Sequence, residues 1–177
     1  MFKNIDNVTM RFITREDKTI IYKAIDENRD FLGVYVDFIK DITEKDFDSL
    51  IKNWEAIQIL GRGFQVGLFE NDEYIGQCNV SIDTYDNRGE IGYWLVKGAT
   101  GKGIMTRAVE QLTSFIFRFH DLNKITIKCV DTNEKSLAIP KRLGFIYEGT
   151  LREHQKLNGV YRDLQVFSKL RREWEID

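Results

Sequence analysis

The chain has 177 residues, 42% of them hydrophobic and 12% aromatic, and its formal net charge at pH 7 is −2. This length fits one domain that buries a sizeable core without disulfides or structural metals, and the aromatic content argues against intrinsic disorder. The balanced charge excludes a general nucleic-acid binder, which needs a strong basic excess, and no apolar run is long enough to span a membrane.

Cysteine and histidine are too sparse to suggest a metal site or a disulfide framework. Cys78 and Cys129 each lie in an apolar, strand-like segment and are interpreted as reduced core thiols of a cytoplasmic protein. His120 and His154 are far apart, and no paired-cysteine zinc pattern occurs. The first ten residues lack the apolar core of a signal peptide, which agrees with a cytoplasmic location.

The two halves of the chain carry opposite charge. Residues 26–73 hold 12 acidic and 5 basic side chains, whereas residues 97–177 hold 10 acidic and 15 basic ones. This asymmetry suggests an anionic ligand on the second half and a cationic ligand near the first. The alternative is that both halves only present solvated surfaces.

The first 60 residues are expected to form a strand followed by helices. Alternating apolar residues predict a strand over residues 8–13. Thr-x-x-Asp capping boxes at 14–17 and 43–46 each precede an amphipathic helical pattern. The aromatic-rich residues 29–41 are compatible with a short helix and a loop.

A run of strands follows. Residues 64–69 and 74–82 flank a short polar turn and predict a hairpin, and residues 90–97 form a strongly apolar strand. The glycine-rich sequence GATGKG at 98–103 then leads into a helix with a continuous apolar stripe from residue 104. The pattern here is strand, turn and helix.

The remaining segments complete a mixed α/β pattern. Residues 124–130 predict a strand, Asn133 is placed to cap a helix over 134–143, and Asn158-Gly159 between two strand-like runs predicts a hairpin. The order is therefore β-α-α-β-β-β-α-β-α-β-β. It predicts a central mixed sheet with helices on both faces.

The turn TGKGIMT at residues 100–106 is a candidate anion site. Glycines allow main-chain amides to crowd around an anion, and the start of a helix adds partial positive charge. The spacing is neither that of a Walker loop nor GxGxxG, because Thr106 stands where a third glycine belongs. A plain tight turn is the alternative.

Three segments together resemble the GNAT acyl-CoA-dependent N-acetyltransferase superfamily: EIGYW at 90–94, the GKG turn and NEKSLAIPKRLGF at 133–145. The closing hairpin, with LNGVYRD at 157–163, is similar to the ribosomal-protein N-terminal acetyltransferase branch, the RimJ/RimL type. The resemblance implies a single GNAT domain over residues 1–177 that uses acetyl-CoA and no metal. Thr100 departs from the usual Gln or Arg, but such a loop grips phosphate mainly through main-chain amides.

The resemblance also implies where acetyl-CoA would lie. Its pantetheine arm would pair with the strand at residues 94–96, and its pyrophosphate would sit on the amides of residues 101–106. Asn133 would hydrogen-bond the pantetheine, and Ser136 would lie near the sulfur. The implied cofactor-binding residues are Trp94, Leu95, Val96, Gly101, Lys102, Gly103, Ile104, Met105, Thr106, Asn133 and Ser136.

In this family a neutral amine attacks the thioester directly in a ternary complex. The tetrahedral oxyanion needs a donor, most simply a main-chain N–H near Leu95. For the departing thiolate we nominate Ser136, which falls in the first turn of the helix capped by Asn133. Pro140 cannot donate to the Ser136 carbonyl, so that carbonyl is expected to be left free. Alternatively, Ser136 only decorates a helix start.

The general base is nominated as Glu90, which opens the apolar strand. Its alternative role is an ion pair with Arg88 or another cation. Glu153 is the second candidate, and strand alternation would place it on the face of Gln155, where the ribosomal branch often has a carboxylate. His154 would point to the opposite face as an exposed residue. A water chain could also replace a dedicated base.

The acceptor is expected to be a cationic amine on the acidic side of the molecule. Phe31, Tyr35 and Phe38 are candidate substrate-binding residues, with a packed aromatic cluster as the alternative. The branch resemblance favours the N-terminal amine of a protein, such as a ribosomal protein. Other readings are a polyamine or aminoglycoside acetyltransferase and a non-catalytic acyl-CoA-binding module. No nucleic-acid or membrane partner is expected, and a homodimer is possible.

Overall fold

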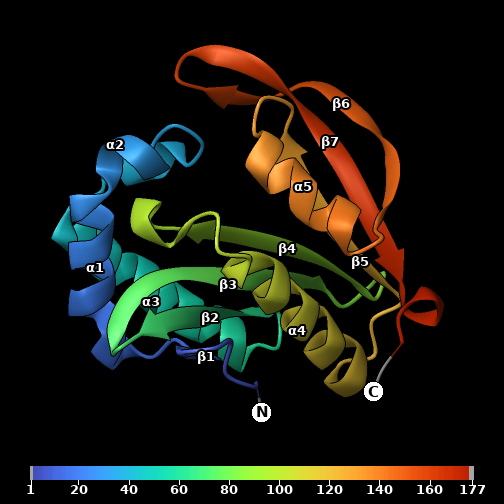
Figure 1. Ribbon diagram of the computed structural model, residues 1–177, viewed down its shortest axis with the longest axis horizontal. Coiled ribbons are helices and arrows are strands. Elements are labelled where there is room, and N and C mark those ends of the chain that lie inside the picture. The colour runs from blue at the N-terminus through green and yellow to red at the C-terminus, as the bar shows by residue number, and fades with distance from the viewer. Residues whose placement is uncertain (1, 176–177) are drawn as a thin grey trace.

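The computed structural model describes residues 2–175, which form one seven-stranded sheet (Figure 1). The strand order is β1-β2-β3-β4-β5-β7-β6, with β4 and β5 parallel and all other neighbours antiparallel. The strands are β1 (Val8–Phe12), β2 (Gly63–Glu70), β3 (Glu73–Asp83), β4 (Arg88–Leu95), β5 (Lys124–Val130), β6 (Ile146–Leu157) and β7 (Val160–Leu170). The predicted mixed α/β fold is confirmed.

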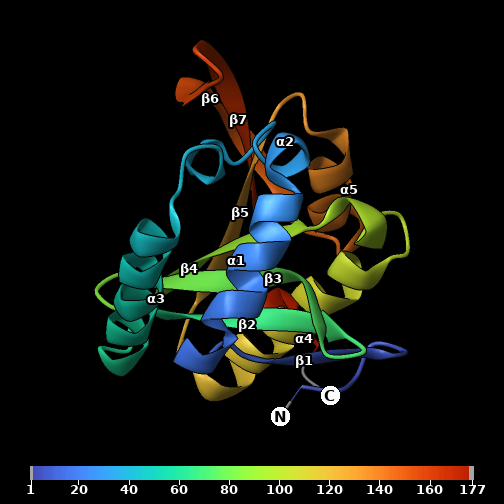
Figure 2. The ribbon, with the colours of Figure 1, turned by 90° about the vertical axis from the view of Figure 1, so that its left-hand side faces the viewer.

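Helices cover both faces of the sheet (Figure 2). They are α1 (Lys18–Glu27), α2 (Arg29–Leu32), α3 (Glu44–Ile59), α4 (Ile104–Phe119) and α5 (Glu134–Arg142). Both predicted capping boxes are present. The one at Thr43 begins α3, and the one at Thr14 begins a 3-10 turn that continues into α1. The ambiguous residues 29–41 resolve into α2 and a 3-10 turn, Asp37–Ile39.

Two apolar cores lie on opposite faces of the sheet. The apolar stripe of α4 packs on one face, where Leu112, Ile116 and Phe117 are fully buried. Helices α1 and α3 pack on the other face through residues such as Ile21 and Phe47. Because successive side chains of a strand alternate, Tyr93 of β4 packs against the α4 core and Trp94 against the α1–α3 core.

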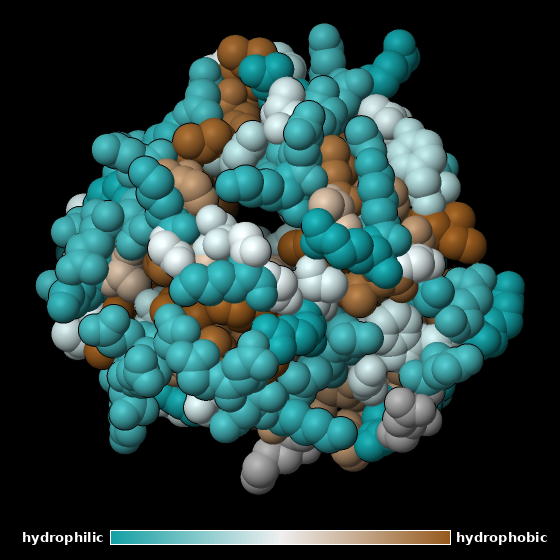
Figure 3. All heavy atoms as spheres, in the orientation of Figure 1, coloured by the Kyte–Doolittle hydropathy of each residue, from teal (hydrophilic) through white to brown (hydrophobic). Residues whose placement is uncertain are grey.

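Strands β4 and β5 are paired over only half of their length. The parallel register runs from Arg88 opposite Lys124 to Ile91 opposite Ile127 and then stops. Beyond that point β4 stays bonded to β3, and β5 stays bonded to β7 as far as Val130. The two strands therefore diverge, because each is held by its outer neighbour. Figure 3, in the orientation of Figure 1, shows a hollow at the centre of the face that the reader sees.

The buried carboxylate of Asp17 ties β1 to the start of α1. It accepts hydrogen bonds from Arg11 Nη1 at 2.8 Å and Nη2 at 2.6 Å, and from the Thr14 amide at 2.9 Å and hydroxyl at 3.1 Å. Burial alone would raise the pKa of Asp17, but these hydrogen bonds and the Arg11 charge outweigh it and lower the pKa.

We expect Asp17→Asn to lower the free energy of unfolding at pH 7 by about 2 kcal/mol, because it weakens several charge-assisted hydrogen bonds. A carboxyl with a depressed folded-state pKa stabilises above its unfolded pKa of about 3.9, and that stability is lost as the pH falls through the folded pKa. The difference in the free energy of unfolding between wild type and Asp17→Asn should therefore narrow below about pH 4. Urea unfolding between pH 3 and 7 measures this difference. A difference that does not change with pH would contradict the stabilising role of the ionised Asp17 carboxylate.

Asp46→Asn is the matched control. Asp46 makes the same capping-box contacts with Thr43 but has no arginine partner. Its substitution should cost about 1 kcal/mol or less, which is the ordinary value of a helix cap.

Candidate active site

The diverging end of β4 offers an open main-chain edge. Residues Gly92 to Leu95 pair with β3 on one side and have no strand on the other among the described residues. The amide of Val96 donates to Ile75 O of β3 at 2.9 Å. Since successive amides of a strand point to opposite edges, the N–H of Leu95 points to the open edge. An extended ligand could pair here as an added strand, as predicted for pantetheine.

The glycine turn follows directly. A 3-10 turn, Lys97–Ala99, leads to Gly101 and Gly103, whose φ angles are +82° and +73°. A Cβ at either glycine would meet no atom within 4 Å, so glycine is required here by backbone conformation and not by crowding. Gly103 is the N-cap of the 16-residue helix α4.

This turn leaves main-chain amides available at the start of α4. The amide of Arg107 donates to Gly103 O at 3.3 Å, which is the first hydrogen bond of the helix. The amides of residues 104–106 have no acceptor within the helix, as at the start of any helix. Lys102 is exposed beside them, whereas Ile104 and Met105 are buried, so only their main chain can face a ligand. Arg142 Nη1 donates to Thr106 Oγ1 at 3.2 Å and places a guanidinium at the same end of α4. The arrangement suits a phosphate.

Ser136 lies in the first turn of α5, as expected. Asn133 caps this helix by accepting the Ser136 amide on Oδ1 at 3.2 Å. Ser136 Oγ lies 3.2 Å from the Sγ of Cys129, on the diverging part of β5. Burial raises the pKa of the Cys129 thiol, although its contacts with Ser136 and Tyr93 partly offset this. The thiol is therefore a neutral neighbour of the Ser136 hydroxyl.

One expectation about this helix is wrong. The Ser136 carbonyl is not free, because the hydroxyl of Tyr93 on β4 donates to it at 2.9 Å. Nothing in the sequence pattern predicts Tyr93 and Cys129 as neighbours of Ser136, which the structure places there. Side-chain alternation along β4 does place Tyr93 on the same face as Ile91. Only the tertiary structure shows that α5 packs over that face.

Glu90 faces the other side of the sheet. Its carboxylate pairs with Lys128 of β5 at 2.7 Å, while Arg88 pairs instead with Asp83 at 2.9 Å. Its side chain is 48% exposed. Of the two alternatives for Glu90, the ion pair is thus present, but the cation is Lys128.

Glu90 lines a pocket of about 560 Å³ on that side of the sheet. The other lining residues come from β3, β4, β5, β6 and β7, and they are Ser81, Ile82, Asp83, Arg88, Gly89, Lys124, Thr126, Lys128, Glu148, Leu151 and Val166. Glu148 is held there by Lys124 and Ser168 at 2.7 Å each, and these contacts lower the pKa of Glu148. The charged residues that line the pocket form the ion pairs Arg88–Asp83, Lys128–Glu90 and Lys124–Glu148.

The prediction that side-chain alternation along the strand places Glu153 on the face of Gln155 is wrong. A bulge interrupts the β6–β7 register between Leu151 and Gln155, and Glu153 has a left-handed φ of +49°. Its amide donates to Asp163 Oδ1 at 2.8 Å, and its side chain is exposed. His154 is exposed, as expected. The catalytic role of Glu153 stays a prediction, without the geometric argument that placed it beside Gln155.

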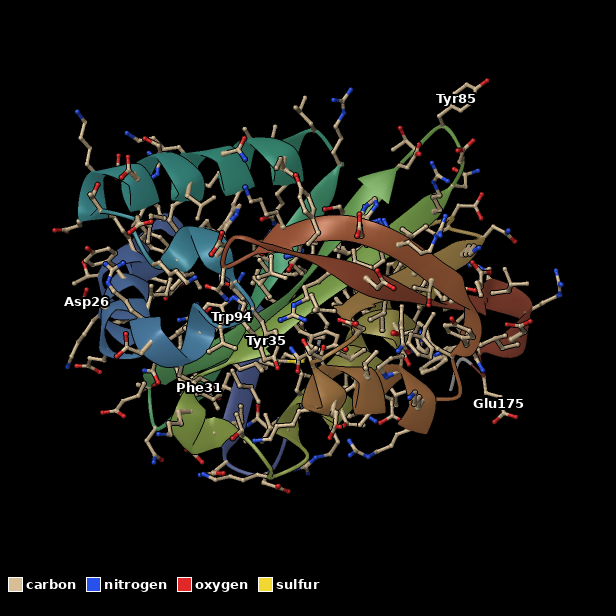
Figure 4. All side chains as sticks on the ribbon, turned by 90° about the horizontal axis from the view of Figure 1, so that it is seen from above. Asp26, Phe31, Tyr35, Tyr85, Trp94 and Glu175 are labelled. Atoms are coloured by element: carbon tan, nitrogen blue, oxygen red, sulfur yellow. The ribbon has the colours of Figure 1, made fainter. Side chains whose placement is uncertain are left out.

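The three aromatic candidates are separated by the structure. Phe31 of α2 packs in the same cluster as Trp94, whose ring meets that of Tyr74 with a centroid distance of 5.5 Å. Tyr35 packs against a small cluster at the end of β5 and donates to Thr132 O at 3.0 Å. Figure 4 labels Phe31, Tyr35 and Trp94 in one area, left of the centre of the view.

Phe38 lies apart from this group. It follows α2 in the Asp37–Ile39 turn and is 54% exposed. Part of the acidic charge of residues 26–73 is neutralised by cations from outside the region, since Arg15 pairs with Glu55 and Lys18 pairs with Asp48. The net charge of residues 26–73 therefore overstates the negative charge of this surface.

Residues 2–175 contain no cluster of three or more His, Cys, Asp or Glu side chains arranged to hold a metal ion. Cys78 and Cys129 are both free and buried. No helix in the described part of the chain is long and apolar enough to cross a membrane.

An open strand edge that runs into a glycine turn at the start of a helix can hold an extended ligand that carries phosphates, as an acyl-CoA does. The family model of the acetyltransferase (GNAT) domain matches residues 7–146. The chain belongs to this family and is an N-acetyltransferase that uses acetyl-CoA as its cosubstrate.

The relatives agree with this assignment, and a solved structure shares the fold. YdaF of Bacillus subtilis (strain 168) is 32% identical over 96% of this chain and 94% of its own length. The ribosomal-protein-serine acetyltransferase of Escherichia coli (strain K12) is 27% identical over 85% of both chains. The structure of RimL, a ribosomal L7/L12 alpha-N-protein acetyltransferase in complex with coenzyme A, has a TM-score of 0.90 at 21% identity and covers 95% of this chain and 96% of its own.

Proposed function

We propose that the protein acetylates the N-terminal α-amine of a ribosomal protein. The observation that carries the donor half of this proposal is the open edge of β4, which runs directly into the glycine turn and the free amides of α4. The acceptor half is supported by the names of the relatives, among them a ribosomal-protein-serine acetyltransferase that matches 85% of the chain.

In this proposal acetyl-CoA binds along β4 and across the start of α4. The pantetheine pairs with residues 94–96, and the pyrophosphate accepts hydrogen bonds from main-chain amides of residues 101–106. Lys102 adds positive charge beside the phosphates. Asn133 uses Oδ1 to cap α5, which leaves its Nδ2 to donate to the pantetheine.

The transfer itself requires three groups. The acceptor amine attacks the thioester carbon, and the N–H of Leu95, at the open edge, stabilises the oxyanion. The tetrahedral intermediate then expels the thiolate, which the Ser136 hydroxyl stabilises by donating a hydrogen bond. The position of Ser136 in the first turn of α5 adds the favourable field of the helix N-terminus.

Glu90 is the proposed base, with Glu153 as the second candidate. Glu90 lies on the side of the sheet away from α4, in the charged pocket, so the acceptor would approach from that side. Its present partner Lys128 is a cation, and an arriving ammonium could take the same position on the carboxylate. An α-amine has a pKa of about 8, so a modest shift suffices to make it neutral.

Glu90→Gln is expected to lower kcat by about tenfold or more, with the largest loss below the pKa of the acceptor amine, where a base is needed most. A pH–rate profile between pH 6 and 9 with a serine-starting peptide measures it. Lys128→Met is the matched control, because it removes the same ion pair and keeps the carboxylate, and it should lose less than about threefold. Equal losses in both variants would remove Glu90 as the base.

The acceptor is identified by coenzyme A release from acetyl-CoA. The acceptors are serine- and alanine-starting peptides, the same peptides with blocked N-termini, a polyamine and an aminoglycoside. Release only with free peptide N-termini is the expected result. Release with the small amines alone would replace the proposed acceptor, and binding of acetyl-CoA without any release would favour a non-catalytic acyl-CoA-binding module.

A further inference from the structure

The first turn of α5 contains a main-chain carbonyl that its own helix cannot satisfy. In a regular helix the Ser136 carbonyl would accept the amide of residue 140, but Pro140 has no N–H. The hydroxyl of Tyr93 donates to this carbonyl at 2.9 Å. A side chain of β4 therefore replaces the amide that the helix lacks.

Tyr93 makes this contact where the sheet opens. Pairing between β4 and β5 ends at Ile91 and Ile127, two residues before Tyr93 and Cys129. Beyond that point the strands are linked through side chains, since the Tyr93 hydroxyl lies 3.6 Å from Cys129 Sγ. Cys129 Sγ in turn lies 3.2 Å from Ser136 Oγ. Tyr93 thus contacts both the main chain of Ser136 and the thiol that lies beside the Ser136 hydroxyl.

We propose that Tyr93 is a positioning residue that holds Ser136 at the diverging ends of β4 and β5. This inference rests on the acetyl transfer and the role of Ser136 proposed above. Without the phenol hydroxyl, the Ser136 carbonyl would lose the donor that replaces the missing amide of Pro140, and the first turn of α5 would lose its tie to β4. Burial raises the pKa of Tyr93 well above its usual value, so the phenol stays a donor throughout the working pH range.

Tyr93→Phe is expected to lower kcat about tenfold, the equivalent of one lost hydrogen bond, while the KM for acetyl-CoA changes less than about twofold. Pro140→Ala then supplies a rescue, because alanine at 140 restores the N–H that can donate to the Ser136 carbonyl. The double variant Tyr93→Phe/Pro140→Ala should recover most of the lost kcat. Failure of the rescue, or a loss confined to KM, would overturn the inference.

A second comparison separates positioning from general destabilisation. In a Ser136→Ala background, Tyr93→Phe should cause little further loss of kcat, because the group that it positions is gone. Tyr74→Phe is the matched control. It removes another buried tyrosine hydroxyl, which donates to Gln77 Oε1 at 2.7 Å on the opposite face, and it should keep kcat within about twofold. Additive losses of Tyr93→Phe and Ser136→Ala would contradict the proposal.

Hydrogen exchange tests the same contact without catalysis. Tyr93→Phe should speed amide exchange in residues 134–142 relative to wild type, and Pro140→Ala in that background should slow it again. If amide exchange in residues 134–142 is the same in Tyr93→Phe as in wild type, the inference is overturned, whatever the kcat of the variant. If wild type acetylates no acceptor, the proposed function fails, and the exchange result still decides whether Tyr93 holds this turn.

Discussion

Ser136→Ala is expected to lower kcat about a hundredfold, because it removes the group proposed to stabilise the departing thiolate. The affinity for coenzyme A should stay within about twofold of wild type, since the main-chain donors of the glycine turn and of β4 are untouched. Steady-state kinetics with acetyl-CoA and a serine-starting peptide, combined with calorimetric titration of coenzyme A, measure both quantities. Retained kcat would show that the hydroxyl has no part in the chemistry.

The control for this experiment is Ser49→Ala. Ser49 also sits in a helix and donates locally, to Lys45 O at 3.4 Å, but it lies in α3, away from the strand divergence. Its substitution should leave kcat and coenzyme A affinity unchanged. A comparable loss there would indicate that alanine substitution of a helical serine disturbs the protein as a whole.

The second large effect is expected at the glycine turn. Replacing both Gly101 and Gly103 by alanine should raise the KM for acetyl-CoA by about thirtyfold or more, because a left-handed conformation costs a non-glycine residue about 1–2 kcal/mol. The added methyl groups meet no atom within 4 Å, so the loss would come from backbone strain that turns the amides away from the phosphates. The dissociation constant of coenzyme A should rise in parallel, with kcat at saturation little changed.

Gly98→Ala is the matched control for the turn. Gly98 lies in the 3-10 turn just before the two glycines, a Cβ there also meets nothing within 4 Å, and its φ is not positive. We therefore expect the KM of Gly98→Ala to equal that of wild type. If this variant weakens acetyl-CoA binding as much as the double variant, the conformation of Gly101 and Gly103 is not what the turn contributes.

Local signals predicted most of the elements. The alternation over residues 124–130 matches β5 at both ends, and the capping box at Thr43 and the cap at Asn133 begin α3 and α5 as expected. Such signals act between residues a few positions apart, so they can be seen without knowing the fold. The strand predicted to begin at Val8 and the helix predicted to begin at Ile104 do begin at these residues, as β1 and α4.

The expectations that failed all depend on longer-range geometry. The bulge in β6 adds residues opposite Asp163, so counting along the strand could not orient Glu153. The missing amide of Pro140 was visible in the sequence, but its replacement by Tyr93 comes from a strand more than 40 residues earlier. Similarly, Lys128 meets Glu90 only because β4 and β5 are parallel neighbours.

The sequence by itself determined the order of strands and helices, the glycine turn before α4 and the family to which that order belongs, because propensity, capping and turn conformation are local properties. The tertiary structure decided where β4 and β5 part, which side of the sheet Glu90 faces and what holds Ser136 in place. These features depend on how β3 and β7 pull the two central strands apart and on contacts between distant segments. Such contacts form only when the whole sheet is assembled.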